Sequence, residues 1–264
     1  MAVSIKAENV TKDFKLRYHR TLKQVSVAAM KGQKVSDTFI AVDNVSFTIE
    51  QGESIGLMGL NGSGKSTLLR LISGVMAPTS GRVQTRGRIA GLIATGAGFH
   101  PQLTGRENIY LNAAALGMSS YEINAVFDDI VEFADIGRFL DVQTGTYSSG
   151  MTSRLGFAIA IHVDCDIFLA DEALAVGDKP FKRKCLNKIE EIRQSGRTIF
   201  YVSHAAASVA KLCDRVIVLE QGKVGFDGPT RDGIRYLHYD IGDDGEPEEL
   251  EEMEEDDAEL GADI

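Results

Sequence analysis

The chain has no tryptophan, only five prolines and three cysteines, and no long apolar run. Its longest apolar stretch, residues 155–161, falls far short of the roughly 18 residues that a membrane-spanning helix needs. Cys165, Cys185 and Cys213 are odd in number and lack the spacing of metal ligands. These absences argue against a membrane-spanning chain, a disulfide-stapled scaffold and a cysteine metal centre. We expect reduced thiols in a cytosolic protein.

The formal net charge of −10 is concentrated at the C-terminal end of the chain. Residues 241–264 hold 13 of the 38 acidic side chains and no Lys or Arg, so the remaining chain carries 25 acidic against 28 basic side chains. A segment this polar cannot bury enough apolar surface to offset its ordering entropy. We therefore predict a disordered acidic tail, either simply solvated or serving as a partner-binding or autoregulatory strip.

Residues 59–66, Gly-Leu-Asn-Gly-Ser-Gly-Lys-Ser, match the phosphate-binding pattern G-x-x-x-x-G-K-[ST]. A strand-like apolar run at 54–58 leads into the loop, and a helix-like run at 67–72 leads out of it. Glycines let the backbone fold round a phosphate, so that N–H groups and the helix N-terminus face the anion. The pattern thus predicts a nucleoside triphosphate site, with a chance glycine-rich turn as the alternative.

Individual residues of this loop have expected roles. Lys65 would reach the β- and γ-phosphates, and the Ser66 hydroxyl would bind Mg²⁺. The residues expected to hold the nucleotide are Gly59, Asn61, Gly62, Ser63, Gly64, Lys65, Ser66 and Thr67.

Two further positions follow apolar strand-like runs. Asp171 follows residues 167–170, where a carboxylate beside the phosphate loop gives Mg²⁺ a ligand, and Glu172 could polarise the water that attacks the γ-phosphate. His204 follows residues 198–202. An isolated histidine is more often structural, but here it would lie level with Asp171 and within reach of a γ-phosphate.

A second anion-binding helix N-terminus is expected near residue 148. The small residues of the segment 147–151, Tyr-Ser-Ser-Gly-Met, precede a helix-like run that extends to Val163. By itself this segment is only a turn and a helix cap.

The order of the remaining patterns predicts an α/β fold. Residues 3–10 and 45–49 have the pattern of antiparallel strands. Further strand patterns lie at 81–93, 167–170, 198–202 and 216–219, and helical patterns at 104–162, 181–195 and 205–213. Within the first helical region, Ser119 and Glu122 form a capping box. The alternation indicates a mostly parallel sheet with right-handed crossovers.

In this order, the loop at 59–66, the signature-like segment 147–151, Asp171-Glu172 and His204 resemble the nucleotide-binding subunits of ABC transporters. Asp178 stands where that family has its D-loop aspartate. The resemblance implies an ABC ATPase domain over residues 1–240, with a RecA-like core, an antiparallel β subdomain and a helical subdomain at about 100–163.

The resemblance also implies a mechanism. Two subunits would dimerise head to tail, so that Ser148, Ser149 and Gly150 of one copy cover ATP and Mg²⁺ held by the other. Glu172, His204 and Lys65 are the implied catalytic residues. Hydrolysis would release the closed state and drive two copies of a separate multi-span permease, with this subunit on the cytoplasmic face of the cell membrane.

Residues 99–109, 147–151, 171–178 and 184–186 are similar to those of polysaccharide and teichoic acid exporters. That resemblance implies export of a polyprenyl-pyrophosphate-linked glycan of the teichoic acid, O-antigen, capsule or galactan type. An importer or drug exporter is the alternative within transport. A soluble ABC-type ATPase acting on ribosomes or DNA is disfavoured by the single cassette and slight basic excess, so no nucleic-acid partner is expected. A small-molecule kinase would have no use for residues 147–151.

Two departures from the family pattern stand out. The Q-loop glutamine should fall near Ala94-Thr95, and neither is Gln. The adenine-stacking aromatic falls at Phe14, with Tyr18 as the alternative.

Residues 12–34 hold seven Lys or Arg against one acid. They form either a solvated insert against the membrane subunit or a strip that meets anionic headgroups or the pyrophosphate of the substrate.

Overall fold

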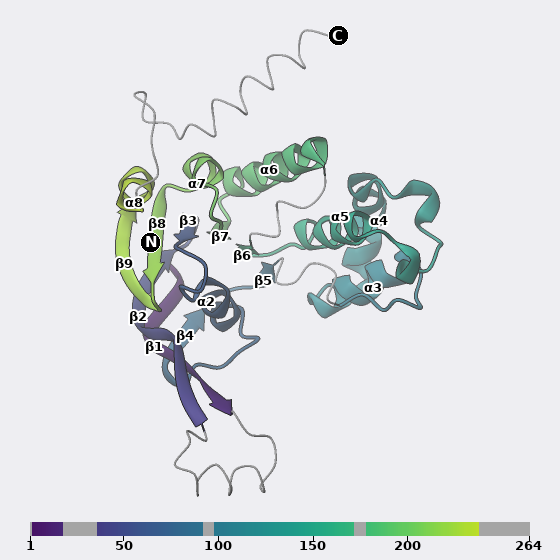
Figure 1. The fold of residues 1–264 in the computed structure, drawn as a ribbon. Coiled ribbons are helices and arrows are strands. Elements are labelled where there is room, and N and C mark those ends of the chain that lie inside the picture. Colours follow the sequence, from purple (N-terminus) through teal and green to yellow (C-terminus); the bar gives the residue numbers. More distant parts are fainter. Residues whose placement is uncertain (1, 18–35, 92–97, 172–177, 238–264) are drawn as a thin grey trace, which may run out of the picture.

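A computed structural model describes residues 2–17, 36–91, 98–171 and 178–237, which form two β-sheets with helices around them (Figure 1). The first sheet is antiparallel, with strand order β2-β1-β4. Its strands are β1 (Val3–Arg17), β2 (Ser36–Glu50) and β4 (Ser80–Thr85).

The second sheet has six strands in the order β5-β6-β7-β3-β8-β9. They are β3 (Ser54–Met58), β5 (Ile89–Gly91), β6 (Ile167–Ala170), β7 (Thr198–Val202), β8 (Arg215–Glu220) and β9 (Lys223–Pro229). All neighbouring pairs are parallel except the β8–β9 hairpin.

Both faces of the six-stranded sheet are covered, so every residue of β3, β6 and β7 is buried. Alternate side chains point to opposite faces. Ile55, Leu57 and Phe200 belong to a core shared with the antiparallel sheet, whereas Phe168 and Tyr201 belong to a core shared with the helices. These strands therefore appear in the sequence as continuous apolar runs without alternation.

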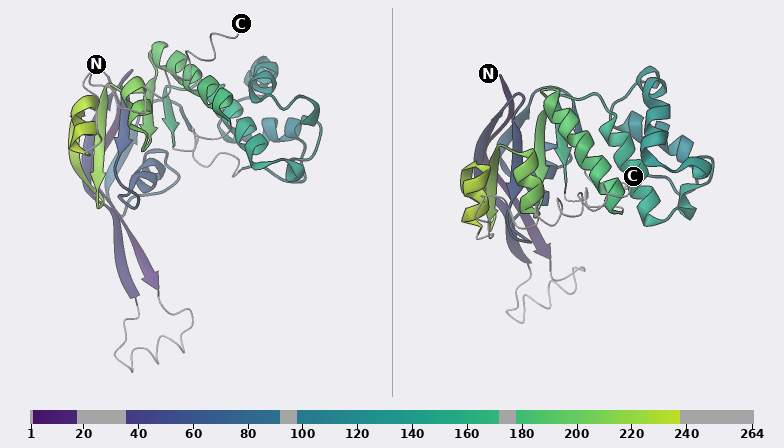
Figure 2. Two further views of the ribbon diagram at one scale, coloured as in Figure 1. Left: turned by 45° about the horizontal axis from the view of Figure 1, so that its top comes forward. Right: turned by 90° about the horizontal axis from the view of Figure 1, so that it is seen from above.

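The described residues also form the following helices. They are α2 (Lys65–Ile72), α3 (Gly105–Ala115), α4 (Ser120–Ala134), α5 (Ser149–Ile161), α6 (Lys179–Gln194), α7 (Ala206–Leu212) and α8 (Thr230–Tyr236), with short 3₁₀ helices η1 (Gly137–Phe139) and η2 (Thr144–Thr146). Helices α3, α4 and α5 gather beyond β5, at the end of the molecule opposite β9 (Figures 1 and 2). The Phe133, Phe157 and Phe181 rings, with centroids 5.7–6.1 Å apart, join this group to α6.

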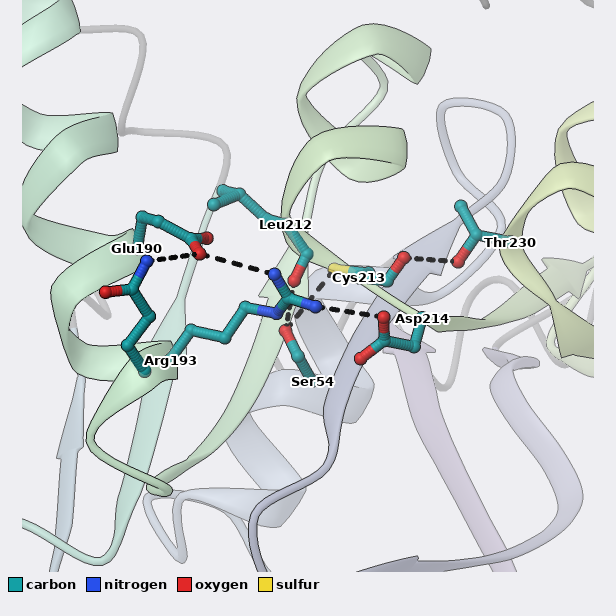
Figure 3. A network of polar contacts seen from close by, with 8 residues as sticks. Ser54, Glu190, Arg193, Leu212, Cys213, Asp214 and Thr230 are labelled. Atoms are coloured by element: carbon teal, nitrogen blue, oxygen red, sulfur yellow. Dashed lines mark hydrogen bonds and ion pairs between the residues drawn. The ribbon is translucent and has the colours of Figure 1, made fainter. Parts of the chain in front are cut away.

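A polar network ties the ends of α6 and α7 to the sheet and to α8 (Figure 3). Arg193 pairs with Asp214 (3.0 Å) and with Glu190 (3.3 Å). The Thr230 hydroxyl donates to the Cys213 carbonyl (2.7 Å), and the Ser54 hydroxyl donates to the Leu212 carbonyl.

The three cysteines are free thiols, as the sequence predicted, and the structure buries all three. Burial raises the pKa of Cys213 to about 12 and that of Cys165 to about 11. These thiols are consequently protonated and unreactive at neutral pH.

Most elements lie where the sequence predicts them. Strands β6 and β7 begin and end at the expected residues, and the capping box of Ser119 and Glu122 starts α4. The expected strands at 3–10, 45–49 and 216–219 are parts of the longer strands β1, β2 and β8, whereas β9 and α8 were not predicted. The predicted acidic tail, residues 241–264, lies outside the described residues.

The outer part of β1 and β2 projects from the body as a two-stranded ribbon (Figure 2). Strand β1 pairs with β4 only as far as Thr11, whereas its pairing with β2 continues to Arg17. Among the described residues, no third strand pairs with this outer part of the ribbon. Leu16, Phe39 and Ile40 are correspondingly half exposed.

Phe200 connects the two sheets, and its removal provides a test of this architecture. Its fully buried ring stacks on Phe47 with a centroid distance of 6.3 Å. We expect Phe200→Ala to lower the free energy of unfolding in urea by about 3–5 kcal/mol, because it leaves a cavity between the sheets. Tyr121→Ala, at a side chain that is 84% exposed, should change it by less than about 0.5 kcal/mol. Equal effects of the two substitutions would contradict this description of the core.

Candidate functional site

The phosphate loop joins β3 to α2 in a backbone conformation that requires glycine. Gly59 has φ 138° and Gly64 has φ 106°, both in the left-handed region. A Cβ atom at Gly59 would lie 2.3 Å from the Leu219 carbonyl oxygen, and one at Gly64 would lie 2.2 Å from that of Ala41. The loop is thus packed tightly between the end of β8 and strand β2.

Helix α2 presents an N-terminus without competing groups. Its N-cap, Gly64, supplies no side chain, and its first turn has no acidic residue. The N–H of Leu68 bonds to the Gly64 carbonyl (2.9 Å), so the N–H groups before it have no partner within the helix. Ser66 is exposed in this first turn. An anion at this end would meet both the free N–H groups and the positive end of the helix dipole.

The Lys65 side chain is folded over the loop. Its Nζ donates to the carbonyl oxygens of Gly59 (2.5 Å) and Leu60 (3.1 Å). Burial lowers the pKa of Lys65, and the nearby Asp171 carboxylate partly opposes this shift. Because neutral carbonyls are weaker partners for an ammonium than anionic oxygens are, a phosphate would compete effectively for Lys65.

Asp171 and His204 lie at the same edge of the sheet as the loop. In the parallel register Leu57 of β3 is opposite Val202 of β7, and Tyr201 is opposite Ala170 of β6. The carboxyl ends of the three strands therefore meet at one edge, where α/β proteins bind ligands. His204 is exposed there.

Asp171 is half-buried beside two cations. Burial raises the pKa of its carboxyl group, while the positive charges of Arg70 and Lys65 lower it. The exposed hydroxyl of Ser66 and the carboxylate of Asp171 are oxygen donors of the kind that Mg²⁺ prefers. The buried Ser63 hydroxyl has no hydrogen-bond partner among the described residues, which leaves the loop a polar group to pair when a phosphate binds.

The signature-like segment caps helix α5. Ser148 is the N-cap, and its hydroxyl accepts a hydrogen bond from the Met151 N–H (3.2 Å). Ser148 and Ser149 are exposed, and the first turn has no acidic residue. The segment therefore has the features of an anion-binding helix N-terminus.

The two helix N-termini lie apart in one chain. The C-terminal end of α5 leads into β6 through a short connection, and its 13 residues extend away from the sheet for about 20 Å (Figure 1). Helix α2 instead packs into the core that the two sheets share, next to β4 (Figure 1). The structure does not bring Ser148 to the phosphate loop of its own chain.

Asp178 caps α6 and is linked to the signature helix. Its carboxylate accepts from the Phe181 N–H (3.2 Å) and pairs with the Arg154 guanidinium (2.8 Å), which lies 4.9 Å from the Phe181 ring centroid. Sequence reasoning missed Arg154, whose partner is 24 residues away. Glu172 and Ala94-Thr95 lie outside the described residues.

Phe14 lies on the projecting ribbon, directly opposite Phe39. The Lys12 ammonium lies 5.5 Å from the centroid of the Phe14 ring. Phe39, which sequence reasoning missed, is 49% exposed, and two residues further along β2 Ala41 contacts the phosphate loop. The alternative aromatic, Tyr18, lies outside the described residues.

The sequence of this chain is similar to those of known ATP-binding subunits of ABC transporters. The family model described as ABC transporter matches residues 42–175. The O-antigen export system ATP-binding protein RfbB of Klebsiella pneumoniae is 42% identical over 228 residues, which cover 83% of this chain and 91% of that protein. The teichoic acids export ATP-binding protein TagH of Levilactobacillus brevis is 45% identical over 235 residues, covering 89% of this chain and 64% of that protein.

Solved structures share the fold. An ATP-binding subunit of an ABC transporter superimposes with a TM-score of 0.70 at 22% identity, covering 89% of this chain and 93% of that one. The cassette MJ0796, described as a dimer in a post-hydrolysis state with ADP and phosphate, gives 0.68 at 24% identity, covering 86% and 98%.

The chain therefore belongs to the ABC transporter family, and its cassette is an ATPase that binds ATP. Across the described ranges, no helix combines the length and the apolar character needed to cross a bilayer.

Lys65 provides a direct test of the phosphate loop. Because burial lowers the pKa of Lys65, the folded protein disfavours its charge, and Lys65→Met should leave the free energy of unfolding without nucleotide unchanged or raised. ATP at about 100 times its Kd should stabilise the parent by about 2.7 kcal/mol and the variant not at all. Thermal unfolding with and without ATP measures both effects.

Lys188→Met is the matched control, since Lys188 forms an i,i+3 pair with Glu191 on the surface of α6. This variant should keep the full stabilisation by ATP. Its free energy of unfolding without nucleotide should fall by less than about 0.5 kcal/mol. ATP stabilising Lys65→Met as much as the parent would remove Lys65 from the site.

Proposed function

We propose that this chain is the ATP-hydrolysing subunit of an exporter that moves a lipid-linked cell-surface glycan across the cytoplasmic membrane. The observation that carries the proposal is identity of 42% and 45%, over 83% and 89% of the chain, to relatives named for O-antigen and teichoic acid export. The shared substrate class would be a polyprenyl-pyrophosphate-linked glycan of the teichoic acid, O-antigen, capsule or galactan type.

Each ATP would be held between two copies of the chain. The N-terminus of α2 and the N-terminus of α5 are both suited to an anion, and they lie apart in one copy. A head-to-tail dimer brings the Ser148–Gly150 segment of one copy onto the phosphate loop of the other. The site is therefore incomplete without the partner copy, and nucleotide becomes a ligand of the closed dimer.

Within this site the residues of the chain take separate roles. The loop N–H groups and Lys65 bind the phosphates, while Ser66 and Asp171 would hold Mg²⁺, which neutralises phosphate charge when bound. Glu172 orients the attacking water and accepts its proton, and His204 contacts the γ-phosphate. Phe14 stacks on the adenine, a contact worth about 1–3 kcal/mol that barely selects a base.

Hydrolysis would be coupled to transport through the dimer. ATP at about 100 times its Kd favours the closed state by about 2.7 kcal/mol per site, and loss of the γ-phosphate contact removes that bias. Two copies of a separate multi-span permease would receive this motion, with the ATPase bound peripherally on the cytoplasmic face of the membrane.

Mixing two inactive variants tests the shared site. Lys65→Met abolishes the phosphate contact, and Ser148→Arg blocks the opposing helix N-terminus, so each variant alone should be inactive. In a mixed dimer, one site combines the intact Lys65 of one copy with the intact Ser148 of the other. An equal mixture should recover up to about one quarter of the parent ATPase rate if the sites act independently. No recovery despite demonstrated mixed dimers would contradict the two-copy site.

Depletion in the native cell tests the substrate class. Without this protein, the lipid-linked glycan should accumulate inside the cell, because its synthesis continues while export stops. Parent protein and the surface variant Tyr121→Phe should restore export, and Glu172→Gln should not. Normal delivery of every surface glycan in depleted cells would refute glycan export while leaving the ATPase assignment intact.

A further inference from the structure

Asn108 of α3 is a fully buried polar side chain that connects two segments distant in sequence. Its amide oxygen accepts from the His100 N–H (2.8 Å). Its amide nitrogen, which has two hydrogens to donate, lies within hydrogen-bond distance of the carbonyl oxygens of His100 (3.1 Å), Leu103 (3.2 Å) and Thr104 (3.0 Å) and of the Thr144 hydroxyl (3.0 Å). Because a backbone N–H can only donate and a carbonyl can only accept, these partners fix the orientation of the amide.

Thr144 makes the same connection from the other side. Its hydroxyl lies 3.1 Å from the His100 carbonyl oxygen and 3.3 Å from that of Leu103, and its N–H donates to Leu103 (2.9 Å). The neighbouring Gly145 N–H donates to the Pro101 carbonyl (2.8 Å). The segment 100–103 and the turn η2 therefore form one hydrogen-bonded unit with Asn108 at its centre.

This unit leads directly into the signature-like segment. The Tyr147 N–H donates to the Thr144 carbonyl (3.0 Å), and the Tyr147 hydroxyl donates to the Phe139 carbonyl (2.6 Å). The hydroxyl also lies against Gly105, where a Cβ atom would come within 2.3 Å of it. Ser148, the N-cap of α5, is the next residue, so its position is set from both sides of the turn.

An apolar side chain could fill the space of Asn108, but it would not select one arrangement. A buried polar network is stable only when each donor and acceptor finds its partner, and this restricts the two segments to one relative position. An error of about 1 Å at a reacting group is enough to lower a rate strongly. The network therefore holds the turn before α5 in one position. A helix N-terminus needs such a fixed position when its ligand is bound to another chain.

We infer that Asn108 is a positioning residue for the nucleotide of the partner copy. Through Thr144 it holds the turn that directs Ser148–Gly150 towards the opposing phosphate loop. This inference rests on the proposed two-copy site, and it assigns a role to residues 99–109, which no other part of the mechanism uses.

ATP-dependent dimerisation in the Glu172→Gln background tests the inference, because that substitution should trap the closed dimer. Thr144→Val removes the hydroxyl and keeps the shape of the side chain. We expect it to weaken dimerisation at least about 10-fold, measured by sedimentation across protein concentrations. The ATP affinity of the monomer should remain unchanged, the lost hydrogen bonds should lower the free energy of unfolding by only about 1 kcal/mol, and Thr144→Ser should restore both stability and dimerisation.

Thr146→Val is the matched control. Its hydroxyl belongs to the same turn, but within the described part of the chain it donates only to the Gln143 carbonyl (2.8 Å). This variant should dimerise like the parent. If Thr144→Val also does so, the inference is overturned and the two-copy site stands.

Two other outcomes also decide the matter. A fold loss of monomer ATP affinity in Thr144→Val as large as its fold loss of dimerisation shows a merely structural network and overturns the inference. If the Glu172→Gln parent binds ATP and remains monomeric at every concentration, the proposed two-copy site fails first, and the inference fails with it.

Discussion

Two helix N-termini suited to an anion lie apart in a single copy of this chain. Helix α2 begins at the phosphate loop, which follows the inner strand β3, and α5 begins at Ser148 in the helical group beyond the edge strand β5 (Figure 1). A triphosphate that uses both must be held by two chains. The fold is compatible with the proposed division, in which the sheet would fix one half of the site and the helical group would carry the other.

The electrostatics of the first half also favour a phosphate ligand. Burial lowers the pKa of Lys65 and raises that of Asp171, so the folded chain disfavours both charged forms even though they attract each other. A phosphate with its metal ion would give each group a stronger partner than the loop provides. The unliganded protein is therefore less stable than it would be with apolar groups at these positions, a cost that functional sites often carry.

The sequence predicted the features that depend on local pattern. Strands β6 and β7 were identifiable because both of their faces are buried, which makes their apolar runs continuous. The phosphate loop was identifiable because its backbone has no room for a Cβ atom at Gly59 and Gly64. The contacts that the sequence could not reveal join distant residues. Asn108 and Thr144 are 36 residues apart, and the pairing of Phe14 with Phe39 depends on the register of a long ribbon. The roles of Glu172 and of the residues near Ala94 remain predictions, since both lie outside the described residues.

Disulfide trapping tests the central claim most directly. Asn61 in the phosphate loop and Ser149 at the start of α5 are both exposed, and the native cysteines are buried. In a variant carrying Asn61→Cys and Ser149→Cys, ATP under non-hydrolysing conditions should produce a covalent dimer on oxidation, and ADP should not. A bond formed within one chain, or no covalent dimer while ATP is demonstrably bound, would contradict the claim that two copies share each nucleotide.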